Sequence, residues 1–103
     1  MGSNKASYDD IKEIVLEIIG DHLGLPSPTL SIEDNIMRDL GADSLDKMEL
    51  IMTIEELFGI KITDQEIPKI ECIGDVANAI QNTSISTSQI ELAKHTWRIV
   101  YRK

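Results

Sequence analysis

Apolar residues recur at intervals of three and four along much of the chain, which is the pattern of helices that bury one face. The first such stretch predicts a helix over residues 8–22, begun by Ser7 and Asp10 as capping residues and ended by Gly24. Its apolar stripe consists of Ile11, Ile14, Val15, Ile18 and Ile19. The chain therefore opens with an amphipathic helix that needs a core to pack against.

The second stretch predicts a helix over residues 44–58 that is apolar on two sides. Asp43 is its expected N-cap, Asp46 the capping-box partner and Gly59 the terminating residue. At roughly 100° per residue, a wide apolar face predicts a buried side; it consists of Leu50, Ile51, Ile54, Leu57 and Phe58. The opposite side carries a narrower apolar stripe set among acids, namely Leu45, Met48 and Met52 with Asp46, Glu49, Glu55 and Glu56.

A long loop is expected over residues 23–42, with residues 26–28 extended or turned rather than helical because of their two prolines. Apolar residues should pin this loop onto the core: Leu30, Ile32, Ile36, Met37 and Leu40. After the second helix, residues 63–66 form a capping-box pattern that Pro68 limits to about one turn. A last core helix is expected to end near residues 81–82, with the stripe Ile73, Val76, Ala77 and Ile80.

The C-terminal part of the chain is open to two interpretations. Residues 83–88 are rich in Ser and Thr and are expected to be a linker. Beyond them, Ile90, Ala93, Trp97 and Val100 have helical spacing, yet Trp97, Ile99 and Tyr101 alternate as in a strand. We expect an N-terminal tail or expression scar over residues 1–7, one domain over 8–82, and a linker with a basic amphipathic segment over 83–103. That segment is either disordered or an additional helix that packs on the acidic body or contacts a partner or a membrane surface.

Charge is distributed unevenly between these parts. Residues 1–82 hold 17 acidic and 6 basic residues, whereas residues 83–103 hold one acidic and four basic residues. Direct nucleic-acid binding requires basic surface, so the acidic body argues against it. The same charge favours steering toward partners with basic patches.

Length and composition indicate the class of protein. At 103 residues the chain has room for one domain, and its single cysteine, Cys72, leaves no intrachain disulfide, as in a reducing compartment. No apolar run approaches the length of a membrane-spanning helix, and no secretory segment is recognisable. We expect a monomer in the cytoplasm, without a membrane span, a metal site or a nucleic-acid site.

Ser44 is the residue with the most evident chemistry. It begins the second helix behind Gly41 and between two carboxylates, where free N–H groups and the helix dipole favour a phosphate. The plainer interpretation is that these residues only cap a helix. A nucleophilic serine needs an oriented base, and neither His22 nor His95 is placed by a motif. We therefore expect no catalytic residue, and interpret Ser44 as an acceptor that another enzyme activates.

The sequence from Leu40 to Asp46, with residues 49–52 and 54–58 and the later 69–70 and 73–76, resembles the acyl carrier proteins of bacterial-type fatty acid synthesis. The resemblance runs from about residue 8 to residue 81. It implies an all-α fold, a four-helix bundle with one short helix, to which the C-terminal segment adds a further helix if it folds. It also implies that a transferase attaches 4′-phosphopantetheine from coenzyme A to Ser44, and that acyl groups are carried on this arm as thioesters.

The resemblance further implies that the second helix recognises partner enzymes. The expected recognition residues are Asp43, Leu45, Asp46, Met48, Glu49, Met52, Glu55 and Glu56. The expected partners are a phosphopantetheinyl transferase and ketoacyl synthases, reductases, dehydratases and acyltransferases with basic docking patches. Lys47 beside the acceptor departs from the family pattern. Two alternatives stay open: a specialised carrier for polyketide, unusual-lipid or aminoacyl loading, and an unmodified acidic regulatory binding protein.

Overall fold

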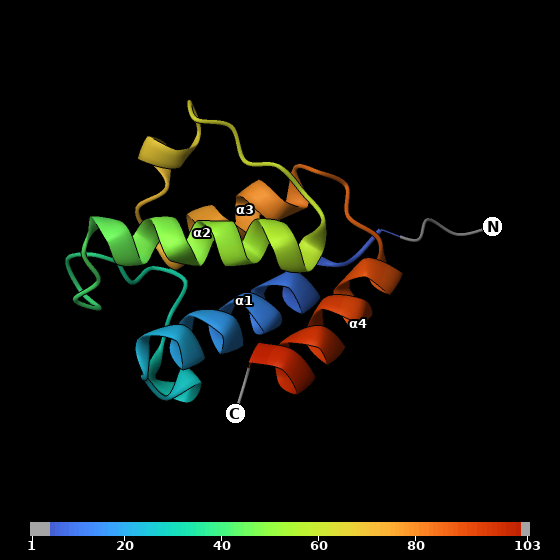
Figure 1. Cartoon of the computed structure of the whole chain (residues 1–103), viewed down its shortest axis with the longest axis horizontal. Coiled ribbons are helices and arrows are strands. Elements are labelled where there is room, and N and C mark those ends of the chain that lie inside the picture. Colours follow the sequence, from blue (N-terminus) through green and yellow to red (C-terminus); the bar gives the residue numbers. More distant parts are fainter. Residues whose placement is uncertain (1–4, 102–103) are drawn as a thin grey trace.

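A computed structural model describes residues 5–101, and these residues are all-α, with no strand among them (Figure 1). The helices are α1 (Tyr8–Leu23), α2 (Ser44–Phe58), α3 (Ile73–Gln81) and α4 (Thr87–Thr96). Three short elements join or extend them: the 3-10 turns η1 (Ser27–Thr29) and η2 (Ile67–Lys69), and the π-helical turn η3 (Trp97–Tyr101). The all-α fold class is therefore confirmed, with the short element present as a 3-10 turn and with an added C-terminal helix.

The predicted start of α1 and both predicted boundaries of α2 are confirmed, and α1 ends at Leu23, one residue later than predicted. The capping residues that set these boundaries lie within one turn of each helix end. The Ser7 side chain accepts a hydrogen bond from the backbone N–H of Asp10 at 3.2 Å, and α1 ends on Gly24 in the left-handed region (φ 73°). Helix α2 spans the predicted residues, and Gly59 ends it with φ 66°. The predicted apolar faces of α1, α2 and α3 are all buried in one core. In that core α1 packs against α3.

The loop between α1 and α2 differs from the prediction at two places. Residues 26–28 were not expected to be helical, but η1 begins at Ser27; Pro28 lies in the first turn, where its missing N–H costs nothing. Ile36 is fully buried, and its backbone N–H donates to the Glu71 carbonyl at 2.8 Å. Met37 does not pin the loop, because its side chain is exposed.

The predicted linker is wrong over its second half. Ser86 caps α4 and forms a reciprocal capping box with Gln89, at 3.0 and 3.1 Å, so the helix begins at Thr87. Ile85 is buried, and its carbonyl accepts from the Ala6 N–H at 2.9 Å. Residues 5–7 are therefore held against the start of α4 rather than forming a tail. The suggested expression scar, residues 1–3, lies outside the described residues.

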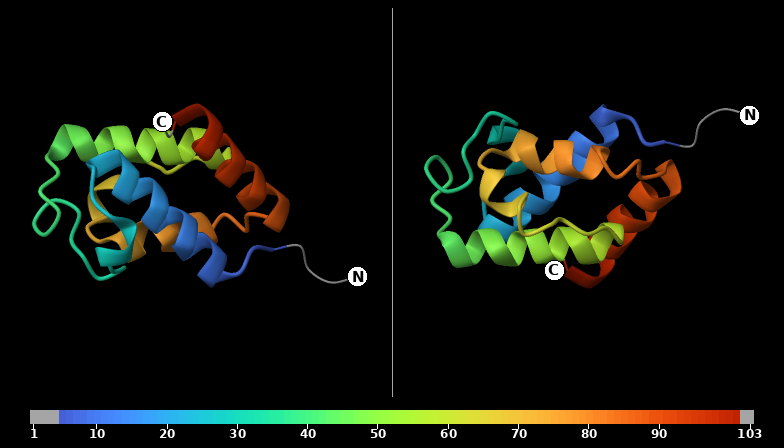
Figure 2. Two further views of the ribbon diagram at one scale, coloured as in Figure 1. Left: turned by 90° about the horizontal axis from the view of Figure 1, so that it is seen from below. Right: turned by 90° about the horizontal axis from the view of Figure 1, so that it is seen from above.

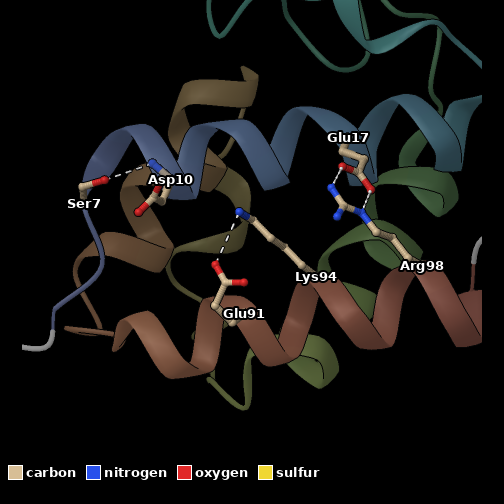
Figure 3. Close-up of polar contacts among 6 residues, drawn as sticks. All are labelled: Ser7, Asp10, Glu17, Glu91, Lys94 and Arg98. Carbon is tan, nitrogen blue, oxygen red and sulfur yellow. Dashed lines mark hydrogen bonds and ion pairs between the residues drawn. The ribbon is translucent and has the colours of Figure 1, made fainter.

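The C-terminal segment, here residues 87–101 comprising α4 and η3, is docked on the body as a helix. Its buried side consists of Ile90, Ala93 and Trp97. Helix α4 packs against both α1 and α2, and its ribbon reaches the C-terminal end of α2 in both views of Figure 2. The Arg98 guanidinium donates to both carboxylate oxygens of Glu17 on α1, at 2.9 and 3.0 Å (Figure 3). The strand interpretation of this segment is thereby wrong, and the packed-helix interpretation is confirmed.

Candidate functional site

Ser44 is held outward at the first residue of α2 by a loop that is anchored to the core. Ala42 is buried, and its N–H donates to the Ile36 carbonyl at 3.2 Å. Gly41, with φ 80°, makes the turn that a side chain would strain, and its N–H donates to Met37. Ser44 itself is exposed. A fixed turn thus presents one hydroxyl to solvent at the start of a helix.

Two carboxylates flank the hydroxyl, and both are engaged with the backbone. Asp43 accepts from the Asp46 N–H at 2.8 Å, and Asp46 accepts from the Asp43 N–H at 3.2 Å. Neither carboxylate forms a hydrogen bond to the Ser44 hydroxyl, nor does either histidine of the described residues. The two carboxylates therefore close the first turn of α2.

The outer side of α2 brings together the residues that the sequence grouped there. Leu45, Met48 and Met52 are 66%, 40% and 57% exposed, in contrast to the buried Ile54 on the other side of the helix. Glu49 is exposed beside them. These three apolar side chains are called the α2 stripe below. Its acidic border is suited to a partner surface that is apolar at its centre and basic at its rim.

Besides Asp43 and Asp46, two further predicted recognition acids have partners within the chain, and these partners lie outside α2. Glu55 is half-buried, and its carboxylate accepts from the Ile62 N–H at 2.7 Å, which fixes the loop after α2. Glu56 accepts from the Tyr101 hydroxyl at 3.2 Å. Burial raises the pKa of the Tyr101 phenol, and the bond to the Glu56 carboxylate adds to the shift. Helical spacing carries no signal for either contact, since both partners lie outside α2.

Lys47, one turn from Ser44, lines a pocket of about 250 Å³ between α2, the preceding loop and η2. The other residues around this pocket are Asn35, Met37, Pro68, Ile70 and Glu71. The sequence did not indicate the pocket, because its walls come from three separate segments. An exposed hydroxyl and the first-turn N–H groups fit a phosphodiester on Ser44. Among the described residues, no cluster of side chains is suited to hold a metal ion.

The helical domain presents an exposed hydroxyl on a capped turn at the start of α2, an arrangement that fits a carrier domain. Residues 13–80 match the family described as phosphopantetheine attachment site. Over 69 residues the chain is 46% identical to the acyl carrier protein of Clostridium acetobutylicum, an alignment that covers 67% of this chain and 90% of that protein. The chain belongs to the acyl carrier protein family.

The structure comparison agrees with this assignment. The fold is similar to that of the acyl carrier protein from Enterococcus faecalis, with a TM-score of 0.65 and 30% identity, over 77% of this chain and 100% of that chain. The chain is thus a carrier with covalently attached 4′-phosphopantetheine, and fatty acid biosynthesis is the typical role of its family. No helix of the described residues has the length and apolar character needed to cross a membrane. The family match ends at residue 80, before α4 begins.

Proposed function

We propose that Ser44 is the attachment residue of the prosthetic group. The observation that carries this proposal is the exposed Ser44 hydroxyl on a turn fixed by the buried Ala42 and by the reciprocal bonds of Asp43 and Asp46. The Ser44 oxygen forms a new bond to phosphorus as the pyrophosphate bond of coenzyme A breaks, and the hydroxyl proton passes to a base of the phosphopantetheinyl transferase. The adenosine bisphosphate moiety leaves.

After this transfer, the residues near Ser44 act on a phosphodiester. The N–H groups of the first turn of α2 and the positive end of its dipole stabilise the negative charge. Lys47 adds a mobile ammonium group one turn away, on the side of the pocket. When bound, the group supplies a terminal thiol that carries acyl chains as thioesters. The chain holds and presents this arm, and the acyl-handling enzymes supply the catalysis.

We further propose that the pathway is fatty acid biosynthesis and that the partners dock on the α2 stripe and its acidic border. The support is the exposure of Met48, Met52 and Glu49 on one side of α2. Ketoacyl synthases, reductases, dehydratases and acyltransferases with basic patches fit this side. Rim charges speed association more than they slow release, which suits a shuttle. The cytoplasmic location expected from the sequence belongs to the same proposal.

The test of attachment uses intact-mass spectrometry after incubation with coenzyme A and a phosphopantetheinyl transferase. The wild-type chain should gain one phosphopantetheine, Ser44→Ala should gain none, and Ser88→Ala, at an exposed serine of α4, should gain one. Failure of the wild type to gain mass would favour an unmodified regulatory protein. For the loaded carrier, acceptance by polyketide or aminoacyl-loading enzymes but not by a fatty acid ketoacyl synthase would favour a specialised carrier.

A further inference from the structure

The C-terminal segment carries a second apolar stripe that packing does not explain. Its inner side is buried, but Leu92, Ile99 and Val100 are 64%, 68% and 63% exposed. Positions 99 and 100 follow position 92 by seven and eight residues, which is about two helical turns. The three side chains therefore lie on one side of the segment. A single exposed apolar residue is ordinary, whereas three on one side of a docked helix form a surface. These three side chains are called the C-terminal stripe.

The C-terminal segment is joined to the end of α2 by polar contacts. The Tyr101 hydroxyl donates to Glu56 at 3.2 Å, and the Gln89 side chain donates to the Phe58 carbonyl at 3.3 Å. Glu56 lines one hollow with Gln89 and Leu92, and a second hollow with Met52 and Ile60. Glu56 therefore lies between Leu92 of the C-terminal stripe and Met52 of the α2 stripe.

The basic side chains of the segment are engaged with acids of the chain. Arg98 pairs with Glu17 on α1 at 2.9 Å, and Lys94, only 18% exposed, pairs with Glu91 at 3.7 Å (Figure 3). The exposed C-terminal stripe is apolar, and its member Leu92 lies next to the acidic Glu56. This disfavours an anionic membrane or nucleic acid as its occupant. Charge complementarity instead favours a protein surface with an apolar centre and Arg or Lys at the rim.

We propose that the C-terminal stripe and the α2 stripe form one continuous docking surface for an acyl-handling enzyme. The proposal rests on the docking role proposed for α2 and adds a second contact, beyond Glu56, that lies outside residues 13–80 matched by the family. An enzyme that contacts both stripes distinguishes this carrier from a carrier whose docking surface is formed by α2 alone. The C-terminal segment is then a specificity element as well as part of the fold.

The experiment measures elongation kinetics with a β-ketoacyl synthase encoded by the same genome, using full-length carriers preloaded with phosphopantetheine and an acyl group. Leu92→Glu and Ile99→Glu should each raise KM about threefold to tenfold with kcat unchanged, because they add an acid to an exposed apolar contact. Asn78→Glu, at an exposed residue of α3, is the control and should leave KM unchanged. Circular dichroism and thermal unfolding of each variant verify that the fold is intact.

Met52→Glu separates this proposal from the one on which it rests. If Met52→Glu raises KM and the two C-terminal variants do not, docking on α2 stands and the proposal for the C-terminal stripe is overturned. If none of the three raises KM, docking on α2 fails and the extension fails with it. A wild-type dimer in sedimentation that Leu92→Glu dissociates would assign the stripe to a second copy of the chain and overturn the enzyme as its occupant.

Discussion

The indole N–H of Trp97 donates to a carboxylate oxygen of Asp21 at 2.9 Å, which ties the end of the C-terminal segment to the last turn of α1. The ring is 4% exposed and stacks on Tyr101, with centroids 5.3 Å apart. Trp97 therefore buries its apolar ring while its N–H group keeps a hydrogen-bond partner. The segment beyond residue 80 contributes to the stability of the bundle.

Replacing this side chain should destabilise the protein strongly. Trp97→Ala removes a buried aromatic ring, and truncations of this kind cost about 3–5 kcal/mol of unfolding free energy. Ile99→Ala, at a side chain that is 68% exposed, is the matched control and should change stability by less than about 0.5 kcal/mol. Urea unfolding followed by circular dichroism measures both. Equal stability of the two variants would mean that α4 is undocked in solution.

Gly20 is expected to resist substitution although it lies within α1. A Cβ at this position would lie 2.7 Å from the backbone carbonyl oxygen of Leu25, which cannot move aside as a flexible side chain does. Alanine gains about 1 kcal/mol of helix propensity, but overpacking costs about 1–3 kcal/mol. We expect Gly20→Ala to lower the melting temperature, whereas Asn78→Ala on the exposed side of α3 should not. A higher melting temperature for Gly20→Ala would refute the close approach.

Asp75 should make stability depend on pH. Partial burial raises the pKa of its carboxyl, but backbone N–H groups of Glu71 and Cys72 donate to it at 2.9 and 3.1 Å, and with nearby Lys47 they hold the pKa below its ordinary value. The Asp75 carboxyl binds a proton more readily in the unfolded chain than in the folded one. Its ionised form therefore stabilises the fold at neutral pH, and this stabilisation is lost as the pH falls through the folded-state pKa.

The variant Asp75→Ala measures this contribution. Asp75→Ala should lower the free energy of unfolding by about 1–2 kcal/mol at neutral pH. The difference in unfolding free energy between the variant and the wild type should become smaller in acid. Chemical unfolding at about pH 7 and about pH 3 gives both values. Asp64→Ala, at an exposed carboxylate of the turn before η2, should be nearly neutral at pH 7. A cost for Asp75→Ala that stays constant or grows in acid would contradict the assigned hydrogen bonds.

Charge reversal at Glu49 should weaken partner recognition without affecting the fold, whereas charge reversal at Glu55 should affect both. Glu49 is exposed, so Glu49→Lys should keep the fold and slow association with a ketoacyl synthase about threefold to tenfold, less so at high salt. Glu55→Lys also removes the acceptor of the Ile62 N–H and should lower stability. Stopped-flow association and thermal unfolding separate the two effects, with Asp64→Lys as the control. An unchanged association rate for Glu49→Lys would remove this acid from the recognition surface.

The helix boundaries and the position of Ser44 could be predicted because their determinants are close in sequence. Asp43, Asp46 and Gly59 start and end α2 through contacts within one turn, and the period of its apolar residues indicates the buried side. Ser86 and Gln89 offered the same kind of signal, but a Ser/Thr-rich stretch also has the composition of a linker. Composition alone therefore does not distinguish the capping box of α4 from a linker.

Contacts across the fold could not be predicted in this way. Glu56 meets Tyr101 across 45 positions, and the contact depends on how α4 packs against α2. The pocket beside Lys47 is formed by segments that only the fold brings together. Helical periodicity showed that the outer side of α2 is acidic and apolar, but it could not show which acids have partners within the chain.

The most direct test of the central claim is to locate the prosthetic group by tandem mass spectrometry of the modified, digested protein. Fragment ions should place one phosphopantetheine on Ser44 and leave Ser31, Ser86 and Ser88 unmodified. Elastase or another protease that cuts between Ser44 and the other hydroxyl residues gives peptides short enough for the assignment. Phosphopantetheine on a different residue, or none after complete incubation with transferase and coenzyme A, would contradict the assignment of Ser44.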